Sequence, residues 1–204
     1  PRFIEQLEKR LGDVYVVHPY FAEQNTQISG LKVDSLSDLI ERTRHLDDVL
    51  YAPFSVFGHG DFNLDNIIYN EHSDTVHFID LHRSKRMDYV QDMSVFLVSN
   101  FRVPEFRTRR RAALNQVINL QLDFAREFAR EQGDETFEAR LALGLVRSFI
   151  SSTRFDIRRT FAEEMLRRAT YLLESLAGVE DGDYASFRPP RDVLIYSPDR
   201  VVSV

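Results

Sequence analysis

The chain has 204 residues, of which 43% are apolar and 28% charged, and it carries 26 Lys and Arg against 32 Asp and Glu. These values are ordinary for a globular protein, so they exclude a disordered chain and a fibrous repeat. The net charge of −6 argues against a broad basic face, and we expect no nucleic-acid partner. No apolar run approaches the ~18 residues that a membrane helix needs, so we expect no membrane span.

The chain contains no cysteine, which excludes disulfides, thiolate metal sites and a cysteine nucleophile. This composition fits a reducing compartment, and we expect a cytoplasmic protein. The opening residues, PRFIE, resemble neither a signal peptide nor a start with methionine. We therefore expect that the chain was processed or cut from a longer one.

The N-terminal segment is predicted to form a helix and then a short strand. Apolar residues recur at helical spacing over 2–11, and Gly12 suits the end of that helix. The run Val14–Val17 predicts a strand that stops before Pro19. Residues 21–33 are predicted to be polar and irregular.

A second helix is predicted after Ser35. Ser35 and Asp38 fit a capping box, in which the two side chains bond to the free amides at the start of a helix. The residues that we expect on its inner face are Leu36, Leu39, Ile40, Thr43 and Leu46.

The central segment predicts a β-hairpin. Two runs that favour strands, Ile67–Tyr69 and Thr75–Ile79, flank Asn70–Asp74, whose composition suits a turn.

Beyond about residue 90 the sequence predicts helices that bury three apolar stripes. These stripes are Leu114, Val117, Ile118, Phe124, Ala125 and Phe128, then Phe137, Leu141, Leu145 and Phe149, and then Phe161, Met165, Ala169, Leu172, Leu173 and Leu176. The third is predicted to end at Gly178, with an irregular tail after it. The basic run Arg107–Arg111 is predicted to be a solvated helix start.

The segment His59–Asn66 carries the groups that phosphoryl transfer needs. That reaction requires a carboxylate to orient the attacking hydroxyl and accept its proton, and oxygen ligands to hold Mg²⁺ against the phosphates. Asp61 and Asn66 lie on one predicted loop, with the same spacing as in the catalytic loop of protein kinases. The hairpin returns the chain, so we expect Asp61, Asn66 and Asp80 to converge on one open cleft. His59 is interpreted as a residue that braces the loop.

These motifs, together with Phe78–Asp80 and Asp88–Met93, resemble the aminoglycoside phosphotransferase family of small-molecule kinases. The resemblance implies that Asp61 is the catalytic base and that Asn66 and Asp80 bind Mg²⁺. It implies that Asp92 supports the site, and we expect its buried carboxylate to accept amide hydrogen bonds near 59–61. ATP would be the phosphoryl donor, and the partner would be a small molecule with a hydroxyl group.

The fold implied by this resemblance is α+β and mainly α: the C-terminal lobe of a protein-kinase-like fold, a helical bundle with a small β-hairpin carrying the catalytic loop. We assign this lobe to residues 35–178 and an irregular tail to 179–204. Residues 1–34 would be a lobe connection or remnant, with the last strand and the hinge in Val14–Tyr20. No glycine-rich phosphate loop or Val-Ala-Ile-Lys-type strand precedes His59, so we expect the N-terminal nucleotide-binding lobe to be missing.

Two other hypotheses stay open. One is a non-catalytic, kinase-like module that binds a nucleotide or a protein partner. The other is a helical interaction domain with an accidental motif, which gives no reason for a hairpin between Asn66 and Asp80. The sequence leaves the acceptor and the choice of ATP or GTP open, and the acidic residues Glu127, Glu131, Asp134 and Glu135 suit either a cationic acceptor or a solvated helix end.

Overall fold

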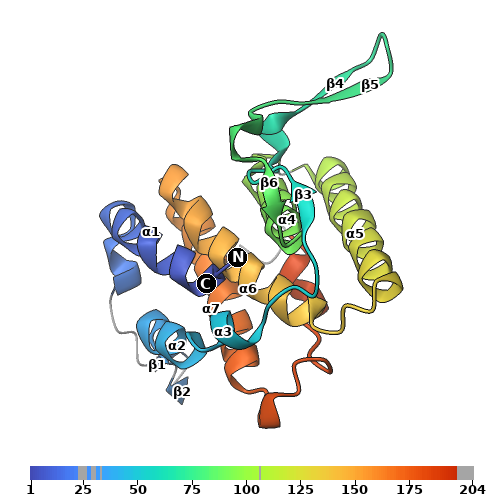
Figure 1. The fold of residues 1–204 in the computed structure, drawn as a ribbon. Coiled ribbons are helices and arrows are strands. Elements are labelled where there is room, and N and C mark those ends of the chain that lie inside the picture. The colour runs from blue at the N-terminus through green and yellow to red at the C-terminus, as the bar shows by residue number, and fades with distance from the viewer. Residues whose placement is uncertain (23–26, 29–30, 33, 106, 197–204) are drawn as a thin grey trace.

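The computed structural model describes residues 1–22, 27–28, 31–32, 34–105 and 107–196 (Figure 1). Its α-helices are α1 (Phe3–Val17), α2 (Leu36–Thr43), α3 (Leu46–Val49), α4 (Val90–Arg102), α5 (Thr108–Glu131), α6 (Phe137–Ser152) and α7 (Arg159–Ala177). Its strands are β1 (Gln27–Ile28), β2 (Leu31–Lys32), β3 (Val56–Gly58), β4 (Ile67–Asn70), β5 (Thr75–Phe78) and β6 (Lys85–Met87). The strands form three antiparallel pairs, β1–β2, β3–β6 and β4–β5. The chain is therefore a mainly helical α+β protein, as the sequence indicated.

Helix α6 is the centre of the core. Every residue of Phe137–Ser152 is buried, and the helix packs against α1, α4 and α7. A helix that is buried on every face requires neighbours on every side. The second and third predicted stripes are confirmed: each of their residues is buried, on α6 and α7 respectively.

The stripe predicted on α5 is partly wrong. Val117 is 40% exposed and Phe124 is 66% exposed. The buried face is narrower and consists of Ile118, Leu122, Ala125 and Ala129. The reason is that α5 packs mainly against α4, so only a thin line of side chains reaches the core.

The strand and hinge predicted at Val14–Tyr20 are also wrong. Helix α1 continues to Val17, and a short 3-10 turn covers Pro19–Ala22. Val14 is fully buried and extends the helical stripe that begins at Phe3, whereas Val16 is 84% exposed. Burial of Val14 against the core outweighs the modest strand preference of a β-branched run.

The predicted helix after Ser35 begins as expected. The Ser35 hydroxyl accepts a hydrogen bond from the Asp38 amide at 3.1 Å, and the Asp38 carboxylate accepts one from the Ser35 amide at 3.3 Å. All five residues predicted for the inner face are buried, although the helix is broken into α2 and α3. Of the irregular segment predicted at 21–33, the structure describes the β1–β2 pair, whereas 23–26, 29–30 and 33 lie outside the described residues.

The predicted hairpin is present as β4 and β5. Ile67 pairs with Phe78, and Asn70 pairs with Thr75 at the turn. The hairpin projects away from the helices (Figure 1), and its apolar side chains Ile68, Tyr69, Val76 and Phe78 are each about half exposed, between 48% and 56%.

The segment after α7 is mostly irregular, as predicted, with 3-10 turns at Glu180–Gly182 and Arg191–Leu194. It is nevertheless held to the core by Phe187, Val193, Leu194 and Tyr196, which are all buried. Residues 197–204 lie outside the described residues.

Part of the basic run at the start of α5 is not solvated. Arg111 is buried and donates hydrogen bonds to the carbonyls of Asn100, Val103 and Glu105. Its guanidinium therefore ties the start of α5 to the end of α4.

Candidate active site

The loop that carries the predicted catalytic residues leaves strand β3 and runs to β4. Strand β3 pairs with β6, with Phe57 opposite Arg86 and Gly58 opposite Lys85. Helix α4 begins directly after β6, so its first turn comes to lie beneath the loop (Figure 1).

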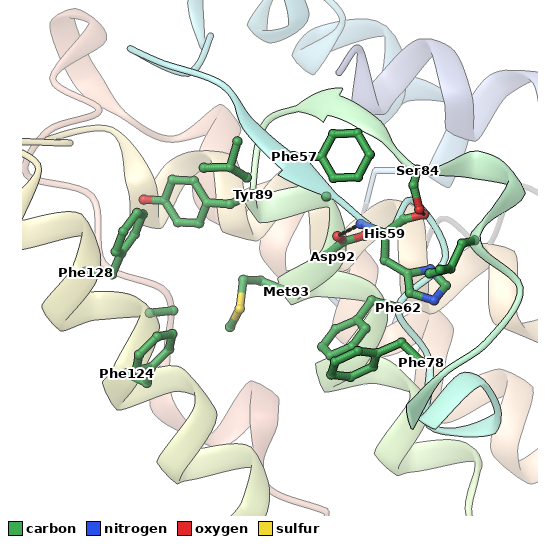
Figure 2. A pocket seen from close by; sticks show the side chains of 14 residues that line it. Phe57, His59, Phe62, Phe78, Ser84, Tyr89, Asp92, Met93, Phe124 and Phe128 are labelled. Carbon is green, nitrogen blue, oxygen red and sulfur yellow. Dashed lines mark hydrogen bonds between the residues drawn. The ribbon is translucent and has the colours of Figure 1, made fainter. Parts of the chain in front are cut away.

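The Asp92 carboxylate anchors this loop from the first turn of α4. One oxygen accepts a hydrogen bond from the His59 amide at 2.6 Å, and the other accepts one from the Gly60 amide at 2.8 Å (Figure 2). These are the amide bonds expected from the sequence, although Asp92 is half-buried rather than buried. A hydrogen bond to an ionised carboxylate is among the stronger ones in proteins, so the pair holds the loop in register with α4.

His59 braces the loop on its other side. Its Nε2 lies 2.9 Å from the carbonyl oxygen of Ile79, and its Nδ1 accepts a hydrogen bond from the Asp61 amide at 3.3 Å. An accepting Nδ1 is compatible with a hydrogen bond from Nε2 to the Ile79 carbonyl. The geometry is that of the bracing role predicted for His59.

Two hydrogen bonds to backbone carbonyls connect Asn66 to Asp61 and to the residue before Asp80. The Asn66 side-chain NH₂ donates to the Asp61 carbonyl at 2.8 Å, and the Ile79 amide donates to the Asn66 carbonyl at 3.1 Å. The hairpin therefore places Asp80 directly after a residue bonded to Asn66. Since the Asn66 NH₂ is engaged, the side-chain oxygen is the group left to bind a ligand.

Asp80 has a left-handed backbone, with φ 60° and ψ 49°. Aspartate is one of the residues that tolerates this conformation. The residue turns the chain out of the hairpin, and its half-exposed carboxylate pairs with His82. Water screens an exposed pair of this kind, so the Asp80 carboxylate can leave His82 and bind another partner at little cost in free energy.

The Asp61 carboxylate is partly exposed and held from two sides. One oxygen lies 3.1 Å from Nη1 of Arg83, and the other accepts from Nδ2 of Asn63 at 3.3 Å. Both contacts fix the position of the carboxylate on the loop.

Position 60 requires a glycine because the backbone of Arg83 lies close to it. Its φ is +86°, and a Cβ at this position would lie 2.5 Å from the Arg83 carbonyl oxygen. We predict that Gly60→Ala lowers the free energy of unfolding by more than the ~1–2 kcal/mol that a left-handed backbone costs an L-residue. Gly133→Ala is the matched control, because Gly133 has φ +65° and open space around it. Urea unfolding of both variants measures the difference, and equal losses would contradict the predicted clash.

An apolar cavity of about 430 Å³ lies between α4, α5 and the loop from β3 to β4, which we call the catalytic loop after the role predicted for it. Figure 2 shows phenylalanine rings from the loop, the hairpin and α5 around it, with Met93 between them. Phe124, which the sequence analysis assigned to the core, is one of its walls. This cavity accounts for the exposure of that ring.

A second, polar cavity of about 190 Å³ begins at Asp61 and is bounded by α1, α4, α6 and the turn after α6. Its lining includes five arginines, Arg10, Arg83, Arg102, Arg147 and Arg154, and a single carboxylate, Asp61. Neither Asn66 nor Asp80 lines it. The convergence of all three predicted residues on one cleft therefore stays a prediction.

A family model described as the phosphotransferase enzyme family (APH) matches residues 8–132 of the chain. The match covers more than half of the sequence. This chain belongs to the phosphotransferase enzyme family. Comparisons with curated proteins and with solved structures found no match.

The matched segment of this phosphotransferase contains β3, the catalytic loop, the hairpin and Asp92, whereas α6 and α7 lie beyond it. The family implies a kinase-like fold for the part that holds the site. No helix in the described part of the chain has the length and apolar character that crossing a membrane requires.

Four arginines of the polar cavity were not among the residues singled out from the sequence of this phosphotransferase: Arg10, Arg102, Arg147 and Arg154. The acidic residues considered there lie elsewhere: Asp134 is buried and paired with Arg140, and Glu127 pairs with Arg130. The Asp134 carboxylate is thus part of the core, and its charge is already paired with Arg140, so it is not available to a cationic acceptor.

Proposed function

We propose that this phosphotransferase moves the terminal phosphoryl group of ATP to a hydroxyl of a small molecule, with Asp61 as the catalytic base. The observation that carries the proposal is the backbone linkage of Asp61, Asn66 and Asp80, held in place by Asp92. A loop built only for packing has no need of hydrogen bonds that hold these three oxygen-bearing residues in a fixed order along the chain.

Asp61 would orient the acceptor hydroxyl and take its proton. As the acceptor oxygen forms its bond to the γ-phosphorus, the bond from that phosphorus to the bridging oxygen breaks, and ADP leaves with the electron pair. Positioning and charge stabilisation account for most of the catalysis in such a reaction. The two amide bonds to Asp92 serve positioning, because they fix the backbone on which Asp61 sits.

The residues present fit a magnesium ion. Asn66 keeps its side-chain oxygen available because its NH₂ is engaged, and Asp80 supplies a half-exposed carboxylate. Mg²⁺ is held in such enzymes by one or two protein oxygens together with phosphate oxygens. When bound, it would neutralise negative charge on the phosphates. No cluster of three or more His, Asp or Glu side chains suited to a metal occurs among the described residues, which agrees with a site completed by the nucleotide.

The nucleotide needs further contacts that these 204 residues do not supply. The sequence has no glycine-rich loop before His59, and the apolar hairpin is about half exposed. A glycine-rich loop and a lysine normally cover the phosphates in kinases. We propose that chain outside these residues provides both and covers the hairpin.

Asp80→Asn is predicted to weaken magnesium-dependent nucleotide binding by roughly tenfold or more, because a carboxylate ligand becomes a neutral amide. Asp74→Asn is the matched control: Asp74 also has a positive φ and an exposed carboxylate, but it lies at the hairpin turn and accepts from the Tyr69 hydroxyl. Calorimetric titration of the protein with ADP, with and without Mg²⁺, measures the effect. Equal affinities for both variants would count against Asp80 as a ligand, and tight binding that ignores Mg²⁺ would favour a non-catalytic module.

A further inference from the structure

The polar cavity beside Asp61 holds an excess of positive charge that the protein does not neutralise. Arg83, Arg102 and Arg154 each have one carboxylate partner, in Asp61, Asp65 and Asp13. Among the described residues, neither Arg10 nor Arg147 has an ion-pair partner within the 4 Å limit for such a contact. Two unpaired guanidiniums thus face one small space.

Arg147 is the most unusual of these residues. It is 4% exposed, its Nη2 donates to the Ser94 hydroxyl at 3.2 Å, and its buried Nε has no hydrogen-bond partner in the described part of the chain. A buried charge normally has a counter-charge, because losing water costs several kcal/mol. A guanidinium that lines a cavity and has no carboxylate partner among the described residues is a candidate for binding an anion there.

Charge repulsion within the cavity supports the same conclusion. Burial lowers the pKa of the Arg147 guanidinium, and the neighbouring Arg10 lowers it further. Burial also lowers the pKa of Arg10, followed by the charges of Arg154 and Arg83. A bound anion would offset the repulsion between these guanidiniums.

We propose that the acceptor of this phosphotransferase carries a phosphate group of its own, which binds between Arg10, Arg147 and Arg154 and thereby presents a hydroxyl to Asp61. This inference rests on the proposed function. A doubly charged phosphate matches the surplus of guanidiniums better than a carboxylate does, and arginine forks suit phosphate oxygens. The cavity of about 190 Å³ has room for a phosphate and a few carbon atoms.

The position of the cavity separates this phosphate from those of the donor. Asp61 lines the cavity, whereas Asn66 and Asp80 do not. The acceptor would therefore approach Asp61 from the arginine side, with the nucleotide on the side of the proposed metal ligands. A cationic amino sugar or a choline-like alcohol would meet repulsion in the same space.

The test is thermal unfolding with inorganic phosphate against chloride at constant ionic strength, in saturating MgADP. We expect phosphate to raise the melting temperature of the wild type. In Arg147→Met and in Arg10→Gln, the phosphate concentration that gives half of this shift should rise at least tenfold. Arg86→Gln removes the same charge from an exposed residue that does not line the cavity, and it should behave as the wild type does. Arg10→Gln keeps the test decisive if Arg147→Met fails to fold, because Arg10 is only half-buried.

The same assay with glycerol 3-phosphate, glycerol and choline tests the acceptor chemistry, and only glycerol 3-phosphate should stabilise the protein. The proposal is overturned if phosphate has no effect, if both arginine variants respond like the wild type, or if MgATP abolishes a shift that persists in MgADP. That last result would mean that the γ-phosphate of the donor, and not a phosphate of the acceptor, binds in the cavity. If Asp61→Asn transfers phosphate as fast as the wild type does, in protein that includes the chain proposed above to cover the nucleotide, while the arginine-dependent phosphate shift is retained, the proposed function is overturned and the anion site stands.

Discussion

Replacing Asp61 by asparagine is expected to lower the rate of phosphoryl transfer by about 10²–10⁴-fold, the usual worth of a positioned acid or base. The asparagine keeps the size of the side chain but cannot accept the hydroxyl proton. Its oxygen can still bond to Arg83 or Asn63, so the loop should keep its shape. The affinity for MgADP should change little, because Asp61 is not a proposed metal ligand.

Asp65→Asn is the matched control for this variant. Asp65 lies on the same loop, its side chain is 78% exposed, and its contact with Arg102 is long at 3.5 Å. The measurement is the release of ADP from MgATP with a set of hydroxyl compounds, phosphorylated ones included, after unfolding curves have shown that both variants are folded. An Asp61→Asn protein as active as Asp65→Asn would remove Asp61 from the chemistry.

The parts of the site that the sequence predicted are those set by short-range spacing. Asp61 and Asn66 sit on one loop, and a hairpin with clear turn residues returns the chain to Asp80. Asp92 was predicted from the resemblance of Asp88–Met93 to the family, and its amide bonds follow from the position of the first turn of α4 beside the loop.

The arginine cavity, in contrast, depends on helices that are distant in sequence. Arg10 on α1 contacts Ser151 on α6 across 141 positions, and no local pattern specifies which helices pack together. One signal was available. Arg147 is the only charged residue in Leu141–Ser152, and a cation within so apolar a run requires an explanation.

The errors at Val14–Val17 and at Phe124 have a common physical origin. Local strand or helix preference is worth a fraction of a kcal/mol per residue, whereas burying a large apolar side chain is worth about 1.5–3 kcal/mol. Packing on the core kept Val14 in a helix. Phe124 lacks such a neighbour and faces the apolar cavity instead.

The largest effect on stability is expected from Arg140→Met. Arg140 is fully buried and pairs with two carboxylates, Asp88 and Asp134, whose side chains are 2% and 0% exposed. Tyr89 also donates its hydroxyl hydrogen to Asp134 at 2.7 Å. Removing the cation leaves two buried carboxylates without a counter-charge, so the free energy of unfolding should fall by about 3–5 kcal/mol. Arg130→Met, which breaks the exposed pair with Glu127, should lower the free energy of unfolding far less, because water screens that pair.

Two further measurements separate lost charge pairing from lost packing in Arg140→Met. A proton removes the charge of an orphaned buried carboxylate, so the deficit of the variant relative to the wild type should shrink as the pH falls towards 4. Adding Asp88→Asn and Asp134→Asn to the variant should likewise restore part of the stability. If neither the lower pH nor the added asparagines reduced the loss of stability, the loss would come from packing alone. Because Asp88 also accepts the Val90 amide at the start of α4, the helix that carries Asp92, a loosened network should disturb the catalytic loop along with the core.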